Sequence, residues 1–425
     1  MNSQSKNKTN TVKFGDVAKR VNDLFPDRSK WNFTKYVTGR DFESGEVRIK
    51  HYNQIKGNEN LIGYQFQWRF QPNDVLYVVK NPRLRKAALV DFEGICSIST
   101  FVIRTDETKF LQKLLPFLMQ TEEFTSFARK NQHGSTNPFL NWKDIAKFEF
   151  NLPSLEHQKQ ILNILLSIEK HIENLENLLE KTKNYMISRR ESLLTRGIGH
   201  TKFKKVPWLF GKEIEIPEEW EVKKIEDVFE FLVSGTNARS DLNDSDEIRY
   251  IHYGDIHTKW NLQLDCDLEK IPRITEEKVS NIPLLKDGDL IIADVSEDVE
   301  GSGTSVLLKN VKNKKIVAGL HTLVLRSKDE NISFEFMKYL TSISHVKIQI
   351  ISYVTGSKVF GLSKKSCKEI KVPFPTLAEQ QKIASILSNI DKQITQQQSH
   401  LNNLKVLRKS ILNSKLTKEK TDVTN

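Results

Sequence analysis

The sequence has little cysteine and no long apolar run. Its 425 residues include three cysteines, Cys96, Cys266 and Cys367, which stand far apart. An odd and scattered set supports neither a disulfide framework nor a CxxC metal site. No stretch of about 18 apolar residues occurs, and the opening MNSQSKNKTN lacks the apolar core of a signal peptide. These absences exclude a disulfide-stabilised or membrane-spanning protein, and we expect a cytoplasmic one.

The motifs of common active sites are also missing. The sequence has no GxxxxGK[ST] phosphate loop, no GxGxxG after a strand, and no HExxH, GxSxG or paired Cys/His metal spacing. Asn137-Pro138-Phe139 is superficially similar to the tetrapeptide with which amino-methyltransferases hold an exocyclic amine, but no glycine-rich cofactor motif accompanies it. The acidic stretch DVSEDVE (294–300) favours a polar loop over a Mg²⁺ site. We predict no catalytic residue, no metal site and no cofactor bound by this chain.

Positive charge is in excess and the chain is long. Lys and Arg number 65 against 54 Asp and Glu, which gives a net charge of +11. Such a balance favours polyanionic partners, because each neutralised phosphate releases counterions. Charge alone leaves nucleic-acid binding and an ordinary basic protein about equally supported. The length exceeds that of one ordinary domain and indicates two to four units.

An internal repeat organises the chain. The segment FNLPSLEHQKQILNILLSIEKHI, from Phe150, returns as VPFPTLAEQQKIASILSNIDKQI, from Val372. The prolines of the two segments, Pro153 and Pro375, set an offset of 222 residues. A chance likeness between two amphipathic helices explains one such match. It does not explain a constant register that runs from about residue 100 to residue 196.

The repeat continues upstream with smaller offsets. The matched pair Asp74 and Asp289 gives 215 residues, and the pair Asp16 and Asp227 gives 211. Each half is therefore one unit, with insertions concentrated in its first part. Short apolar runs (VLYVV and FVI, then DLIIA and TLVLR) predict strands, and helical stretches are expected at Phe110–Arg129 and Phe334–Ser344. The fold class is α+β: two mixed α/β domains in tandem, each followed by a long helix.

The predicted boundaries follow from this pattern. The stretch from 198 to 219 has no period and contains Pro207, Gly211 and Pro217, so it is interpreted as a connector. The expected order is a first mixed domain at 1–150, a first helix at 151–197, the connector at 198–219, a second mixed domain at 220–374, a second helix at 375–417 and a tail at 418–425.

Capping residues and a heptad pattern predict the two long helices. Ser154 is expected to cap the first helix, Thr376 with Glu379 to form a capping box on the second, and Gly197 to end the first. Spacings of four and three then favour helix-on-helix packing, rather than burial against the helix's own domain or an intermolecular coiled coil. The predicted seam is Ile161, Leu165, Ile168, Ile172, Leu175, Leu179, Met186, Ile383, Leu387, Ile390, Ile394, Leu401 and Leu404.

The doubled block resembles the DNA specificity subunit of type I restriction–modification systems. The likeness is carried by GSTNPFLNWKDIAKFEFNLPSLEHQKQILNILLSIEKHI and GSKVFGLSKKSCKEIKVPFPTLAEQQKIASILSNIDKQI. The connector FKKVPWLFGKEIEIPEEWEVKKIEDV looks like the family's usual lead into its second recognition domain. The likeness covers nearly the whole chain. The first half departs from the pattern because it begins at TVKFGDV without its own IPEEWEV-like opening, which leaves its N-terminal boundary open.

The resemblance implies a non-catalytic subunit with two target-recognition domains, each reading one half of a split, asymmetric site on double-stranded DNA. It implies that the long helices pack as an antiparallel coiled coil that fixes the half-site spacing. They would also dock two modification (adenine methyltransferase) subunits, which bring S-adenosylmethionine. Restriction subunits, which use ATP and Mg²⁺, would join to cleave. The repeat supports this independently, since a pseudo-two-fold chain presents two like faces to two identical partners.

Two loops in each domain are candidates to contact DNA. Their Lys and Arg residues offer donors to guanine edges and phosphates, although a solvated surface charge is an equal alternative for each. Asparagines there also suit turns, and His252 and His257 also suit the core. The candidates are Lys80, Asn81, Arg83, Arg85, Lys86, Lys130, Asn131, His133, Ser135, Thr136 and Asn137 in the first domain, and Arg239, Ser240, Arg249, His252, Tyr253, His257, Ser357 and Lys358 in the second.

On this interpretation Arg85→Ala relaxes sequence choice, whereas Lys358→Ala mainly weakens binding.

Three other functions stay open from the sequence. The same architecture serves other methyltransferase-linked systems, the chain could be a nuclease in its own right, or it could be a coiled-coil scaffold without nucleic-acid function. The missing metal and nucleophile motifs count against the nuclease.

Overall fold

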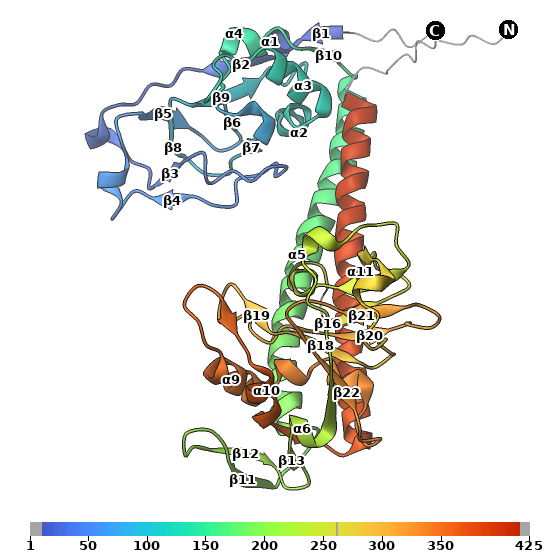
Figure 1. Ribbon diagram of the computed structural model, residues 1–425. Helices are drawn as coiled ribbons and strands as arrows, with labels where there is room; N and C mark the ends of the chain where they lie inside the picture. Colours follow the sequence, from blue (N-terminus) through green and yellow to red (C-terminus); the bar gives the residue numbers. More distant parts are fainter. Residues whose placement is uncertain (1–10, 261, 417–425) are drawn as a thin grey trace, which may run out of the picture. The chain divides into compact units, whose positions relative to one another are not determined.

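The computed structural model describes residues 11–260 and 262–416 and divides into two compact units. The described part of 1–178 forms the first unit together with that of 397–425, and the described part of 179–396 forms the second. Each unit therefore combines one mixed domain with one end of each long helix (Figure 1). Within the described ranges, no helix is both long enough and apolar enough to cross a membrane.

The first unit contains two four-stranded sheets, with strand orders β2-β9-β6-β7 and β4-β3-β8-β5, and the pair β1-β10. Its elements are β1 (Thr11–Lys13), α1 (Phe14–Val17), β2 (Ala18–Val21), η1 (Arg28–Lys30), β3 (Lys35–Val37), β4 (Asn53–Gln54), η2 (Glu59–Leu61), β5 (Phe66–Phe70), β6 (Val75–Val78), η3 (Pro82–Leu84), β7 (Ala87–Leu89), β8 (Gly94–Ser97), β9 (Thr100–Thr105), η4 (Gln112–Leu114), α2 (Leu115–Met119), α3 (Glu122–Lys130), α4 (Trp142–Ile145), β10 (Glu149–Asn151) and the start of α5 (Leu155–Arg196).

The second unit repeats this plan around a five-stranded sheet, β14-β22-β18-β20-β16, with the smaller sheet β17-β15-β21 and three strand pairs, β11-β12, β13-β24 and β19-β23. Its elements are β11 (Phe203–Pro207), β12 (Glu213–Pro217), β13 (Glu221–Lys224), α6 (Ile225–Val228), β14 (Phe229–Leu232), η5 (Arg239–Asp241), β15 (Ile248–Ile251), α7 (Tyr253–Thr258), β16 (Leu262–Asp265), β17 (Arg273–Ile274), η6 (Glu276–Lys278), β18 (Leu290–Ala293), β19 (Val295–Ser296), β20 (Ser305–Lys309), β21 (Ile316–Ala318), β22 (Thr322–Ser327), α8 (Phe334–Met337), η7 (Leu340–Ser342), α9 (Ser344–Tyr353), β23 (Phe360–Gly361), α10 (Lys364–Glu369), β24 (Lys371–Phe374) and the start of α11 (Leu377–Leu416).

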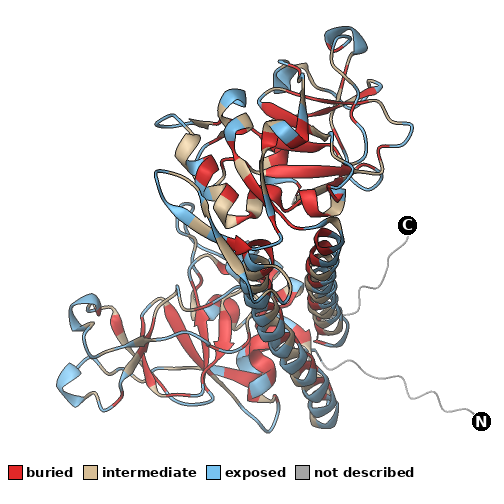
Figure 2. Cartoon of the chain, turned by 90° about the horizontal axis from the view of Figure 1, so that it is seen from below, coloured by how far each residue is buried: buried red, intermediate tan, exposed pale blue. Residues whose placement is uncertain are grey.

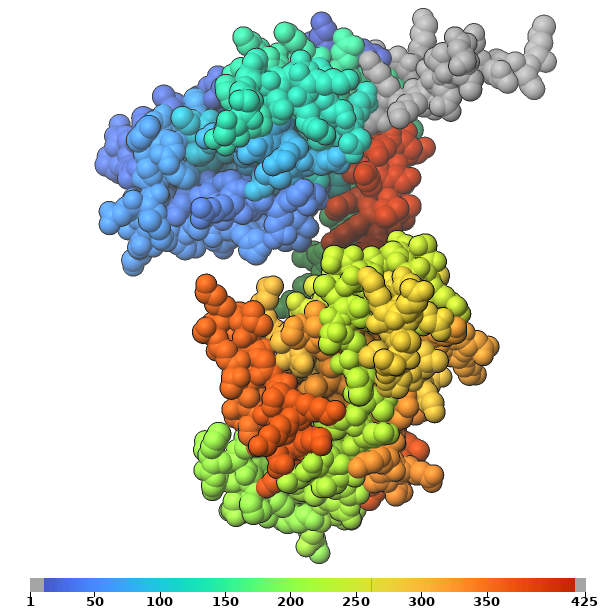
Figure 3. Space-filling model, in the orientation of Figure 1, coloured from blue at the N-terminus to red at the C-terminus, as the bar shows by residue number. Residues whose placement is uncertain are grey.

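Two local predictions were wrong. The stretch Phe110–Arg129 is divided among η4, α2 and α3, because Pro116 starts a new helix and the Thr121 hydroxyl caps another by accepting from the Phe124 N–H at 3.2 Å. The stretch Phe334–Ser344 is likewise divided between α8 and η7. The connector contains a β-hairpin, β11-β12, which lies at the surface of the second unit (Figure 3, green).

The capping box on α11 is only half formed. The Thr376 hydroxyl accepts from the Glu379 N–H at 3.4 Å, as predicted. The Glu379 carboxylate instead accepts from the Ile198 N–H at 2.8 Å and lies 2.9 Å from both the His200 Nε2 and the Trp220 Nε1. Tertiary donors outcompete the local one because Trp220 is completely buried and its indole N–H needs an acceptor. Glu379 thereby joins the end of α5 to the start of α11 within the second unit.

The long helices α5 and α11 pack together. Every predicted seam residue is buried or half-buried, and Figure 2 shows the buried side of each helix in red. In the first unit Arg408 donates to Glu169 and Lys405 to Glu176, both at 2.7 Å, so the two helix ends run antiparallel. In the second unit apolar residues of α5 and α11 share one core with the mixed domain, including Met186, Leu193, Leu194, Ile383, Leu387 and Ile390.

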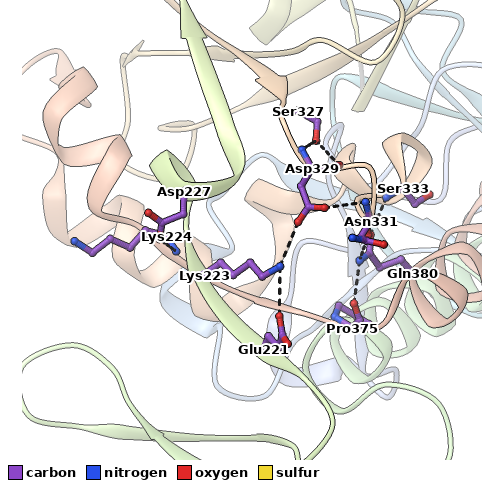
Figure 4. A network of polar contacts seen from close by, with 10 residues as sticks. All are labelled: Glu221, Lys223, Lys224, Asp227, Ser327, Asp329, Asn331, Ser333, Pro375 and Gln380. Carbon is purple, nitrogen blue, oxygen red and sulfur yellow. Dashed lines mark hydrogen bonds and ion pairs between the residues drawn. The ribbon is translucent and has the colours of Figure 1, made fainter.

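A buried glutamine at the start of each long helix ties that helix to its domain. Gln158 accepts from the Leu111 N–H at 2.9 Å and donates to the carbonyl oxygens of Lys109 and Pro153. Gln380 makes the three equivalent bonds, to Ser333, Asn331 and Pro375 (Figure 4). Both side chains are almost fully buried. The repeat found in the sequence is therefore also a repeat of individual hydrogen bonds.

A buried ion pair repeats as well. The Arg104 guanidinium on β9 donates to both carboxylate oxygens of Asp74, at 2.5 and 2.9 Å. The Arg326 guanidinium on β22 does the same for Asp289, at 2.8 and 2.6 Å. Each aspartate also accepts from the backbone three residues before it. Bidentate pairing and this added donor offset the cost of burying a carboxylate at the start of the central strand.

We expect Gln380→Ala to destabilise the second unit by about 2 kcal/mol, because it leaves the buried Ser333 N–H without its acceptor and two carbonyl groups without a donor. Urea unfolding followed by circular dichroism measures this. The control Gln381→Ala changes an exposed glutamine on the same helix and should cost less than about 0.5 kcal/mol. Equal effects of the two variants would contradict the anchoring role.

Candidate functional site

The structure brings the two candidate loops of the first domain together. Lys80 pairs with Phe139, and the Asn81 N–H donates to the Pro138 carbonyl oxygen at 2.7 Å. His133 and Phe139 exchange backbone hydrogen bonds of 2.8 and 2.9 Å, which closes a hairpin over residues 133–139. We call residues 79–86 and 133–139 together the first edge. Segments some 50 residues apart in sequence thus form one backbone surface.

The candidate side chains of the first domain divide into exposed and anchoring ones. Arg85 donates to Glu122 at 2.5 Å and to the Gln120 carbonyl oxygen at 3.3 Å, and the Lys86 ammonium donates to the Gly39 carbonyl oxygen at 2.6 Å. Asn131 donates to the Phe127 carbonyl oxygen at the end of α3. The exposed candidates are Lys80, Arg83, Lys130, His133, Ser135, Thr136 and Asn137. An effect of Arg85→Ala on sequence choice would therefore act through the shape of the loop.

His133 is exposed but held in place. Its Nε2 lies 2.8 Å from the Asp144 carboxylate, and its ring lies 5.7 Å from that of Phe139. Partial burial tends to raise the pKa of Asp144, but hydrogen bonds from His133 and Asn141 outweigh it, and the pKa is lowered. Asp144 therefore stays ionised and orients the imidazole at the base of the hairpin.

The second domain forms a matching edge. Val295 on β19 pairs with Gly361, and Thr355 pairs with Gly361 across a hairpin over residues 355–361. We call residues 294–304 and 355–361 together the second edge; β19 marks it in Figure 1. The hairpin requires glycine at position 356, where φ is +135° and a Cβ would lie 1.9 Å from the Val359 carbonyl oxygen. Ser357 and Lys358 are exposed at its tip.

An aromatic cluster lies beside the second edge. The His257 Nε2 is 2.8 Å from the Val295 carbonyl oxygen. The Tyr253 ring packs against His252 at 4.6 Å, against His321 at 5.3 Å and against His257 at 6.4 Å. Three of the candidates, Tyr253, His252 and His257, are therefore neighbours. The fourth ring, that of His321, was not predicted from the sequence.

Ion pairs hold the rest of this cluster. The Arg239 guanidinium lies 3.0 Å from the buried Asp255 carboxylate and 3.4 Å from the His252 Nδ1, while Ser240 is exposed on the same 3-10 helix. Burial, followed by the charge of Arg239, lowers the pKa of His252. Arg249 instead donates to the Cys266 carbonyl oxygen at 2.7 Å from strand β15. Most of these candidates are therefore bound within the domain, whereas Arg239, Ser240, Ser357 and Lys358 are exposed, Arg239 while paired with Asp255.

The two edges share one register. In the first, the second residue after β6, Lys80, pairs with Phe139 of the hairpin. In the second, the second residue after β18, Val295, pairs with Gly361. These pairs are related by the offsets of 215 and 222 residues already visible in the sequence. Combining the two offsets would have identified Val295 as the counterpart of Lys80. Sequence reasoning missed it because it selected residues by chemistry alone.

The described residues offer no site for metal or thiol chemistry. None of them form a group of three or more His, Cys, Asp or Glu suited to a metal ion. Burial raises the pKa of Cys266 to about 11 and that of Cys367 to about 12, so both thiols stay protonated and unreactive. The geometry instead provides the first and second edges, which share one pattern of backbone pairing and carry different side chains.

A family model described as type I restriction modification DNA specificity domain matches residues 7–184 and again 217–405. The type I restriction enzyme MjaVIII specificity subunit of Methanocaldococcus jannaschii is 27% identical over 340 residues, which cover 76% of this chain and 74% of that protein. The putative MjaX specificity subunit of the same organism is 24% identical over 410 residues, covering 92% and 87%.

Solved structures show the same fold. A chain from a structure of the type I R-M system, on its complex assembly and conformational transition, aligns with a TM-score of 0.60 at 18% identity and covers 96% of this chain and 97% of that one. The type I S subunit from M. genitalium aligns at 0.56 and 14% identity, covering 98% of both. The tandem domains and paired helices thus define a two-domain DNA specificity protein. The chain belongs to the family of DNA specificity subunits of type I restriction–modification systems.

We expect Lys358→Ala to weaken binding to all duplexes about equally and to reduce the salt dependence of binding by about one counterion, because an exposed lysine at the hairpin tip suits a phosphate contact. Fluorescence anisotropy over a range of salt concentrations measures both. Lys312→Ala is the matched control. Lys312 is also exposed, but it follows the C-terminal end of β20, whereas the second edge precedes the N-terminal end of that strand. Altered base preference without a change in salt dependence would contradict a phosphate contact.

We expect the second unit to lose stability as the pH falls below about 6.5. The pKa of His252 is lower in the folded chain than in the unfolded chain, so acid protonates the unfolded chain first and favours unfolding. Burial lowers the pKa of His345 in the same unit as well. Unfolding free energies at about pH 7.5 and pH 5.5 measure the loss. His252→Gln should reduce it, His252→Gln with His345→Gln should reduce it further, and the exposed His400→Gln should not. An unchanged pH dependence in the double variant would refute this account.

Proposed function

We propose that this chain is the non-catalytic sequence-reading subunit of a restriction–methyltransferase complex, with each mixed domain reading one half of a bipartite, asymmetric DNA site. The observation that carries the proposal is the pair of matching edges. The backbone pairing is the same in both, whereas the side chains on it differ. A constant frame with variable side chains is what two readers of different sequences require.

The paired helices are proposed to set the half-site spacing and to dock two modification subunits. A rigid helix pair makes the distance between readers a geometric quantity. Large apolar side chains exposed outside the seam support docking, because a partner that covers them removes apolar surface from water. These side chains are Ile164, Tyr185 and Ile187 on α5, and Val406 and Leu407 on α11, each about half exposed or more.

In this proposal the chemistry resides in the partners. The modification subunits would bind S-adenosylmethionine and methylate adenine, and restriction subunits would use ATP and Mg²⁺ to cleave double-stranded DNA. The chain itself would contribute only recognition and assembly.

Genome-wide adenine methylation, mapped with and without this gene, tests the proposal. We expect one bipartite motif to disappear on deletion and to return on complementation, because no other subunit would supply the sequence choice. Purified chain mixed with the modification subunits should then protect the same motif in a duplex. Loss of no motif, or methylation or cleavage of DNA by the purified chain alone, would overturn the proposal.

A further inference from the structure

The loop between β18 and β20, residues 294–304, holds the place in the second domain that the β6–β7 loop, residues 79–86, holds in the first. Both loops leave a central strand of the main sheet, in the orders β22-β18-β20 and β9-β6-β7. Both pair with the hairpin that follows. Val75 pairs with Leu89, whereas its counterpart Leu290 pairs with Leu307, so the second loop is three residues longer.

The two loops carry opposite charge. The first contains four basic residues and no acidic one, namely Lys80, Arg83, Arg85 and Lys86. The second contains four acidic residues and no basic one, namely Asp294, Glu297, Asp298 and Glu300. Basic side chains suit guanine edges and phosphates, whereas a carboxylate repels phosphates and accepts only from exocyclic amino groups of bases. Two equivalent positions therefore imply two different kinds of DNA contact.

Contacts within the domain distinguish the acidic side chains that are engaged from the one at Glu297, which is accessible. Asp294 lies 3.3 Å from the His321 Nδ1 and is largely buried. Asp298 accepts from the Gly301 N–H at 2.5 Å and closes a turn. Glu297 is exposed, and it directly follows Ser296, which pairs with Phe360 of the hairpin. Its backbone position is therefore fixed while its carboxylate is accessible.

The far end of the loop is fixed too. The Lys347 ammonium on α9 donates to the carbonyl oxygens of Glu300 and Ser302, both at 2.6 Å. With β19 paired at one end with the hairpin that carries the exposed Ser357 and Lys358, and Lys347 bound at the other, residues 297–299 form a short tethered tip. A carboxylate on a tethered tip meets its partner at little entropic cost.

We propose that Glu297 is a specificity-determining residue of the second domain, whose carboxylate accepts a hydrogen bond from the exocyclic amino group of a cytosine or adenine in the half-site that this domain reads. The assignment rests on the proposed function. It also rests on backbone pairing shared with the first edge, where Arg83, which the offset of 215 matches to the neighbouring Asp298, is likewise exposed. The two half-sites are thus read by side chains of opposite charge, basic in the first edge and acidic in the second, on the same pattern of backbone pairing.

The test is the methylation motif directed by Glu297→Gln, expressed in a strain deleted for the natural gene. Glutamine keeps the size of the side chain but adds a donor, so discrimination at one base pair of one half-site should fall about tenfold. The other half-site should be unchanged. Arg83→Ala should alter the opposite half-site, and Glu277→Gln, an exposed acidic residue elsewhere in the second domain, should alter neither.

Binding of the chain, assembled with its modification subunits, to duplexes varied at each position gives the second measurement. Circular dichroism checks that the variants fold, and Glu297→Asp tests a shortened carboxylate. An unchanged motif in Glu297→Gln would overturn the inference. So would equally raised affinity for every duplex, since the loop would then merely repel phosphates. If the natural chain directs no motif at all, the proposed function fails rather than this assignment.

Discussion

The buried glutamine at the start of each long helix is the interaction on which each half depends. Gln158 and Gln380 bond the first turn of a helix to the segment that follows the last long strand of its domain. Three hydrogen bonds made by one buried amide are costly to break, because water cannot replace them. These bonds fix the orientation of each domain relative to the start of its own helix. Any loop that reads DNA from such a domain inherits its orientation from this contact.

The repeat explains how the two domains can differ in sequence and still keep the same contact with their helices. The glutamine ties, the Asp–Arg pairs and the pairing of the two edges recur bond for bond. Insertions and charge changes fall in the loops between these contacts. A substitution at Arg83 or Glu297 breaks none of the repeated bonds. The fold therefore separates residues that make the repeated contacts from loop residues that can vary without breaking them.

Much of the fold could be predicted because its signals are periodic. The repeat, the heptad seam and the strands VLYVV and DLIIA all follow from spacing, and α5 begins within one residue of the expected cap at Ser154. Broken helices were missed because the Pro116 and Thr121 signals are local and compete with a continuous apolar pattern. The site was harder to predict. Nothing in the sequence shows that Arg85 and Arg249 bond within the domain, since their partners, Glu122 and Cys266, are distant in sequence.

Both edges are ordered by contacts within the fold, although by different means. In the first, Asn81 and Arg85 adopt left-handed backbone angles, with φ of 52° and 50°, which asparagine tolerates but which are unfavourable for arginine. Bonds to Pro138 and Glu122 hold them there. In the second, His257 and Lys347 hold the loop through its carbonyl oxygens. Ordering is thus completed during folding, so in the proposed function less entropy would be lost on binding DNA and more of the contact energy could discriminate between bases.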